Sequence, residues 1–171
     1  VGAINSAYFL SNGMPANLLA RNNEIINYGI LGSTTESPTQ NPVAFGISST
    51  GKAIADYYEM KHTFEVGGVT YTIDSIDATR DPNKTVIYSE SNAKTGTNEW
   101  GMEIVVENVA QGTKSLKLGD VLEGTVKSKT VYGQPGNSVV PKNGYVISIQ
   151  NKVIAAQLSE IAIGAPIKAS L

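Results

Sequence analysis

A short polar segment between residues 94 and 103 holds most of the side chains that could carry chemistry. It contains Thr95, Thr97 and Asn98, followed by the only tryptophan of the chain, Trp100, and it runs directly into an apolar stretch that includes Glu103. Hydroxyl and amide groups can hydrogen-bond a sugar or a phosphate, and an indole face can stack on a sugar ring. The alternative interpretation is a surface turn with a packed tryptophan.

Arginine is rare in this chain and occurs only at positions 21 and 80. A planar guanidinium can hold a phosphate group through two parallel hydrogen bonds, so such a contact is limited to Arg21 or Arg80. Arg80 is the better candidate because Asp74 and Asp77 precede it at the end of an expected strand. The alternative is a local ion pair of Arg80 with Asp77 or Asp81, which is a common surface feature.

Carboxyl groups are the usual machinery of glycoside cleavage, in which one protonates the leaving oxygen and the other attacks the sugar carbon or activates water. Alternation along residues 102–106 places Glu103 on the opposite face from Met102, Ile104 and Val106. Glu103 also adjoins the polar segment. We therefore expect Glu103 to be the acid nearest to a site.

Metal and cysteine chemistry have little support in the sequence. The chain has no cysteine, which excludes disulfides, thiolate metal sites and a cysteine nucleophile. The single histidine, His62, has no second histidine or triad partner, and we expect a surface or strand residue there. Carboxylates such as Asp74, Asp77 and Glu99 could hold a calcium-type divalent cation, but their spacing fits no dedicated loop. No cofactor or metal site is predicted.

Strand signals dominate the elements that must position these residues. Gly67-Gly68 and Asn143-Gly144 fit tight turns, and Gly124 inside one expected strand predicts a bulge or bend. Helix signals are weaker. The predicted fold is α+β and predominantly β, with a mixed sheet, a hairpin-rich subregion and one or two short helices. The expected strands cover residues 69–73, 85–88, 102–106, 120–127 and 144–149, and the helix candidates cover residues 153–163 and, less clearly, 15–27.

Length and composition limit the classes of protein that the chain can represent. Its 171 residues fit a single domain, 1–171. With 41% hydrophobic and 16% charged residues, the chain is too apolar for disorder and has no apolar run that could span a bilayer. A net charge of −2 without a basic stripe makes nucleic acid an unexpected partner. The start at Val1, without a charged-then-apolar leader, suggests a processed or trimmed end.

Three blocks of the chain resemble the phosphodiester glycosidase (uncovering-enzyme) family, which removes an N-acetylglucosamine covering mannose 6-phosphate. Residues 3–9 resemble the family's N-G-G-F/Y-F opening, with Ser6-Ala7 in place of the two glycines. The middle block resembles an N-x-x-R motif, a V-L-Y strand and T-x-T-N-x-x-G-x-E-V-V-V, with Asp77 in place of the first asparagine. Residues 141–148 resemble I-P-x-N-G-Y-V-L-S. Family members continue with R-T-x-x-G and D-G motifs, so the resemblance leaves two alternatives: the chain is one piece of a longer or cleaved precursor, or it is a shortened relative that keeps the scaffold without the completed site.

The resemblance implies a secreted or cell-surface hydrolase that acts on a sugar linked through a phosphodiester. The alternative is a non-catalytic carbohydrate-binding or cell-envelope-binding module of a surface or phage protein, and a third possibility is a structural domain of such an assembly. In either of the first two cases the partner is a carbohydrate or sugar phosphate. The expected catalytic residues are Glu103 and Asp77, and the expected substrate-binding residues are Arg80, Asn5, Thr95, Thr97, Asn98 and Trp100.

Overall fold

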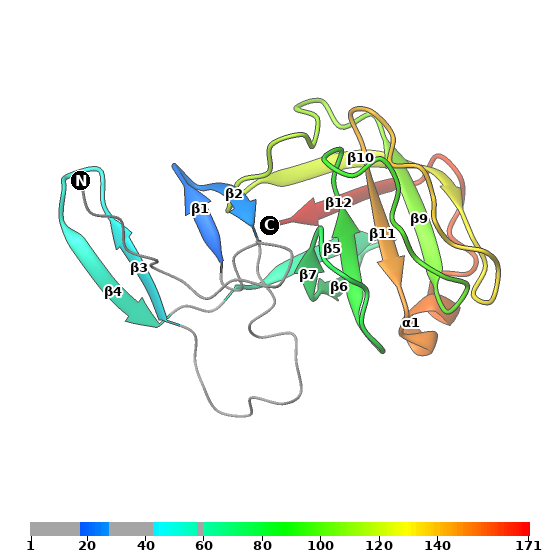
Figure 1. Ribbon diagram of the computed structural model, residues 1–171. Helices are drawn as coiled ribbons and strands as arrows, with labels where there is room; N and C mark the ends of the chain where they lie inside the picture. Colours follow the sequence, from blue (N-terminus) through cyan, green and yellow to red (C-terminus); the bar gives the residue numbers. More distant parts are fainter. Residues whose placement is uncertain (1–17, 28–42, 58–59) are drawn as a thin grey trace.

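The computed structural model describes residues 18–27, 43–57 and 60–171, and this part of the chain is built mainly from β-strands (Figure 1). An eight-stranded mixed sheet curls into a nearly closed, barrel-like shape, two separate hairpins accompany it, and there is one short helix. The prediction of a predominantly β fold with a mixed sheet, hairpins and a short helix is therefore confirmed.

The elements of the described residues follow one another in this order: β1 Leu19–Arg21, β2 Glu24–Asn27, β3 Val43–Ile47, β4 Ala53–Tyr57, β5 His62–Val66, β6 Val69–Ile73, β7 Ser75–Ile76, β8 Thr85–Tyr88, β9 Met102–Glu107, β10 Val121–Lys129, β11 Tyr145–Ile149, α1 Lys152–Gln157 and β12 Pro166–Ser170. No described helix has the length and apolar character needed to cross a membrane.

The large sheet has the strand order β6-β5-β12-β10-β9-β11-β8-β7. Neighbouring strands are antiparallel except for β7, which runs parallel to β8. The remaining strands form two hairpins, β1 with β2 and β3 with β4, and Glu24 of β2 also forms an isolated antiparallel bridge with Lys117. In the sheet, β9 lies between β10 and β11, so the strand that carries Glu103 is held on both sides.

The two faces of β9 have different surroundings, as the alternation predicts. Met102, Ile104 and Val106 belong to the main hydrophobic core, whereas Val105 packs in a smaller apolar cluster on the other face. Glu103 shares that second face and has no exposed surface at all. A carboxylate at such a position needs protein hydrogen-bond donors, because burying an unpaired charge is strongly unfavourable.

The expected turns form. Gly67 and Gly68, with φ of +60° and +78°, connect Val66 to Val69, its partner in the β5–β6 hairpin. Positive φ at both central residues suits the right-handed twist of a hairpin, and glycine adopts it without a steric penalty. Asn143, at φ +52°, lies in the turn just before β11.

Three local predictions need correction. The weaker helix candidate, residues 15–27, contains the β1–β2 hairpin, because Asn22 and Asn23 both have positive φ and form its turn; residues 15–17 lie outside the described residues. The helix expected at residues 153–163 covers only residues 152–157 and begins after Asn151, whose side chain caps it. The bulge expected at Gly124 occurs between Val126 and Ser128 instead.

Gly124 has a packing role. A Cβ atom at this position would lie 2.6 Å from Val106 Cγ1 and 2.7 Å from the Glu107 main-chain oxygen. We expect Gly124→Ala to lower the free energy of unfolding by about 1–3 kcal/mol, because the added methyl group overpacks the contact with β9. The measurement is urea unfolding followed by circular dichroism. Gly46→Ala is the matched control, since a Cβ there meets no atom within 4 Å, and equal effects of the two substitutions would contradict this packing role.

Candidate functional site

An open cavity of about 450 Å³ has several of the predicted site residues in its lining. It lies where the segment after β7 meets the polar segment before β9. Five of the residues singled out from the sequence are in its lining. Its lining includes Asp77, Arg80, Tyr88, Asn92, Thr95, Thr97 and Asn98.

The Arg80 guanidinium is fixed by neutral oxygen atoms. Its Nη1 donates to Ser148 Oγ at 2.7 Å, and its Nη2 donates to the main-chain and side-chain oxygens of Asn98 at 3.1 and 2.8 Å. Gly101 makes room for the group, since a Cβ there would lie 2.7 Å from Arg80 Cζ. Within the described residues Arg80 has no ion pair, and its buried Nε has no hydrogen-bond partner. The local ion pair considered from the sequence therefore does not form.

Glu103 contacts Thr97, a residue of the cavity lining, and donors surround its buried carboxylate. Its Oε1 accepts from Thr97 Oγ1 at 2.6 Å and from Ser148 Oγ at 3.1 Å, and its Oε2 accepts from the Ser138 main-chain nitrogen at 2.9 Å. Burial acts to raise the pKa of Glu103, but the hydrogen bonds from Ser138, Thr97 and Thr95 outweigh it and hold the pKa below its ordinary value. Glu103 is therefore ionised at neutral pH.

The ionised Glu103 determines the direction of the hydrogen bonds around it. A carboxylate only accepts, so Ser148 and Thr97 must each use their single proton on it. The Ser148 oxygen is then free to accept from Arg80 Nη1. The buried charge thus orients the hydroxyl groups and, through Ser148, the guanidinium.

Asp77 takes part in a second, separate set of contacts. Its carboxylate accepts from the Ser89 main-chain nitrogen at 2.7 Å, from Ser89 Oγ at 2.6 Å and from Asn92 Nδ2 at 2.5 Å. Although Asp77 as a residue is exposed, burial of its carboxylate raises its pKa, and the contacts with Ser89 and Asn92 act in the opposite direction. Asp77 also has φ +50°, a conformation that asparagine and aspartate tolerate best among non-glycine residues.

The remaining predicted residues lie elsewhere. Trp100 is 55% exposed and lines a different cavity, although its main-chain nitrogen donates to Asn98 Oδ1 at 3.2 Å. Asn5 lies outside the described residues. His62 is a buried residue of β5, and burial lowers its pKa.

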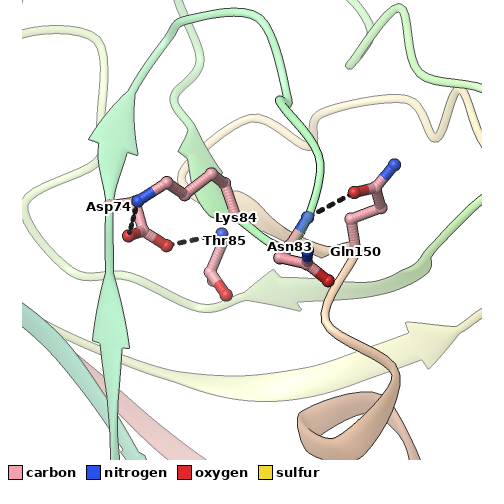
Figure 2. Close-up of polar contacts among 5 residues, drawn as sticks. All are labelled: Asp74, Asn83, Lys84, Thr85 and Gln150. Carbon is pink, nitrogen blue, oxygen red and sulfur yellow. Dashed lines mark hydrogen bonds and ion pairs between the residues drawn. The ribbon is translucent and has the colours of Figure 1, made fainter. Parts of the chain in front are cut away.

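Asp74, one of the carboxylates considered for a divalent cation, binds protein groups instead. Asp74 accepts from Lys84 Nζ at 3.0 Å and from the Thr85 main-chain nitrogen at 2.8 Å (Figure 2). These two contacts connect the start of β8 to the residue that follows β6. Among the described residues, no group of three or more histidine, aspartate or glutamate side chains could hold a metal ion.

Several residues of the site were not identified as such from the sequence. The donors Ser138, Ser148, Ser89 and Asn92 are serines and asparagines scattered over 60 positions of an already polar sequence, so composition does not distinguish them. Ser148 did carry a signal, because it is the only polar side chain in the apolar strand β11. A polar residue in a fully buried strand indicates a buried polar partner, which here is Glu103.

Comparisons of the chain with protein-family models, with curated proteins and with solved structures find no match. The function must therefore be inferred from the site itself.

Glu103 should make stability depend on pH in a defined way. Its folded-state pKa lies below the ordinary value of 4.5, so its contribution is complete above that value and is lost as pH falls through the folded pKa. We expect Glu103→Gln to lower the free energy of unfolding by about 1–3 kcal/mol at about pH 7, because an amide nitrogen then faces donors, and by progressively less as pH falls through the folded-state pKa of Glu103.

The measurement is urea unfolding of both proteins at a series of pH values from neutral to strongly acid. Glu99→Gln is the control, because Glu99 is exposed and its loss should change stability little throughout the series. A penalty for Glu103→Gln that stays the same at acid pH would show that the ionised carboxylate is not what the site requires.

Proposed function

We propose that this chain forms the phosphate-binding part of a secreted or cell-surface hydrolase that acts on a sugar joined through a phosphodiester. The resemblance of its middle block to the phosphodiester glycosidases suggests the substrate class. The observation that carries the proposal is the state of Arg80 in the polar cavity.

Arg80 has the properties that an anion-binding arginine needs. It is oriented by Ser148 and Asn98, which are neutral, so its charge is not neutralised by a direct partner within the described residues. Leaving a buried Nε–H without an acceptor costs about 1–3 kcal/mol. A geometry that is unfavourable for folding but presents an oriented guanidinium in a cavity supports a binding role for this residue.

The other cavity residues fit a bound sugar phosphate. Thr97 and Asn98 lie beside Arg80 in the lining and supply hydroxyl and amide groups that can orient a sugar. Glu103 acts in this proposal as an ionised base or stabilising charge, because its lowered pKa disfavours the protonated form that a general acid requires. Asp77, with a raised pKa, is the second carboxyl group.

A second candidate function is carbohydrate binding without catalysis. Glu103 has no exposed surface and does not line the cavity, and both carboxylates are already occupied by protein donors. A general acid or base must come within hydrogen-bond reach of the proton that it transfers. Binding alone requires no such approach.

The two arginines of the chain provide a matched test. We expect Arg80→Lys to weaken binding of the methyl phosphodiester of N-acetylglucosamine 1-phosphate by about tenfold or more, because lysine keeps the charge but loses the planar fork. Arg21→Lys should stay within about twofold of the parent, since Arg21 lies exposed on β1. Isothermal titration calorimetry measures both affinities.

A second measurement distinguishes the two candidate functions: the same compound is incubated with the chain, and the release of free N-acetylglucosamine is followed. Binding with release supports the hydrolase, and binding without release supports the binding module. Equal affinities of the Arg80→Lys protein and the parent would contradict a phosphate-binding role for this cavity.

A further inference from the structure

A second cavity, of about 340 Å³, surrounds the exposed tryptophan and is separate from the lining of the Arg80 cavity. We call it the Trp100 groove. Its lining includes Asn83, Trp100, Tyr132, Gln150, Asn151 and Lys152. These residues come from the loop before β8, the segments on either side of the β9–β10 arm and the start of α1.

The aromatic residues of the Trp100 groove provide a platform for a ring. Trp100 is 55% exposed, which is a large exposed apolar surface for the only tryptophan of the chain. Tyr132 is partly buried, and Lys152 Nζ lies 5.6 Å from the centre of its ring. An exposed indole face favours stacking on the apolar face of a sugar. The contact of the Lys152 ammonium with the Tyr132 ring keeps a positive charge within the Trp100 groove.

Two amide side chains of the groove, Gln150 and Asn151, already use their carbonyl oxygens as hydrogen-bond acceptors. Gln150 Oε1 accepts from the Asn83 main-chain nitrogen at 2.5 Å, and the Gln150 amide nitrogen points away from that bond (Figure 2). Asn151 Oδ1 accepts from the main-chain nitrogens of Val153 and Ile154 at 3.0 and 3.2 Å. Since both carbonyl oxygens are occupied, the amide N–H groups of these side chains and the Lys152 ammonium remain available to a ligand.

The charge in the lining of the Trp100 groove is positive. Lys152 is its charged member, and none of the described residues in its lining is acidic. A neutral sugar would satisfy only part of this donor set, whereas a carboxylate accepts several hydrogen bonds and pairs with the ammonium.

We infer that the Trp100 groove binds an acidic sugar, with the pyranose ring stacked on Trp100 and its carboxylate held by Lys152 and the amide groups of Gln150 and Asn151. This site goes beyond the proposed function, because it needs neither Arg80 nor hydrolysis of a phosphodiester. It gives the chain a means of holding an acidic polysaccharide.

Trp100 reports on its own groove, because it is the only tryptophan. Its fluorescence is recorded while the chain is titrated with a hexamer of galacturonic acid. The matched ligand is the same hexamer with its carboxyl groups reduced to alcohols. We expect a saturable change in emission with the acidic hexamer, about tenfold weaker binding of the reduced hexamer, and loss of the difference at high salt.

Two substitutions test the residues assigned to the carboxylate. Lys152→Gln removes the charge, and Gln150→Glu keeps an oxygen for the Asn83 main-chain nitrogen while it replaces the donors with a negative charge. Each should weaken binding of the acidic hexamer by about tenfold. Lys142→Gln is the control of equal charge change and should stay within about twofold, because Lys142 is exposed before the opposite end of β11.

Three results would overturn the inference: no change in Trp100 emission, equal binding of the acidic and reduced hexamers, or an effect of Lys142→Gln as large as that of Lys152→Gln. The hexamer contains no phosphodiester, so a chain that fails to bind or cleave the sugar phosphodiester can still bind it. The two proposals therefore fail independently.

Discussion

The structure around the cavity depends on one constraint, which is the burial of the Glu103 charge on the central strand β9. A carboxylate without exposed surface is tolerated only when donors enclose it, and here they come from three separate segments through Thr97, Ser138 and Ser148. The polar segment before β9, the loop before β11 and β11 itself are thereby tied to one point. The same charge orients Ser148, which in turn holds Arg80.

Asn98 connects the two cavities. Its side-chain oxygen accepts from Arg80 Nη2 and from the Trp100 main-chain nitrogen, so the guanidinium and the start of the tryptophan loop share one acceptor. Gly136 allows the loop before β11 to approach this point, since a Cβ there would lie 2.6 Å from the main-chain oxygen of Asn98. If both proposals hold, a ligand in the Arg80 cavity and a sugar on Trp100 lie on neighbouring parts of one hydrogen-bond network.

Much of the sheet could be predicted from the sequence, because β8, β9 and β11 are short, β-branched and bounded by turn residues, and the alternation in β9 correctly put Glu103 opposite Met102 and Ile104. The β1–β2 hairpin was missed because its signal is local, in Asn22 and Asn23, and does not appear in the periodicity of apolar residues. In the site, Thr97 and Asn98 could be grouped by their proximity in the sequence, and the resemblance to the phosphodiester glycosidases added Arg80 to them. Their link through Ser148, 68 positions after Arg80, depends on strand pairing and could not be read from spacing.

The most direct test of the central claim observes the arginine side chains themselves. Because the chain has only two arginines, ¹⁵N-edited NMR of the arginine Nε–Hε groups gives two signals, which Arg21→Lys assigns. On titration with the methyl phosphodiester of N-acetylglucosamine 1-phosphate, the Arg80 signal is expected to shift saturably while that of Arg21 stays in place. An unchanged Arg80 signal, or equal shifts of both signals, would contradict the account of this cavity as a phosphate-binding site.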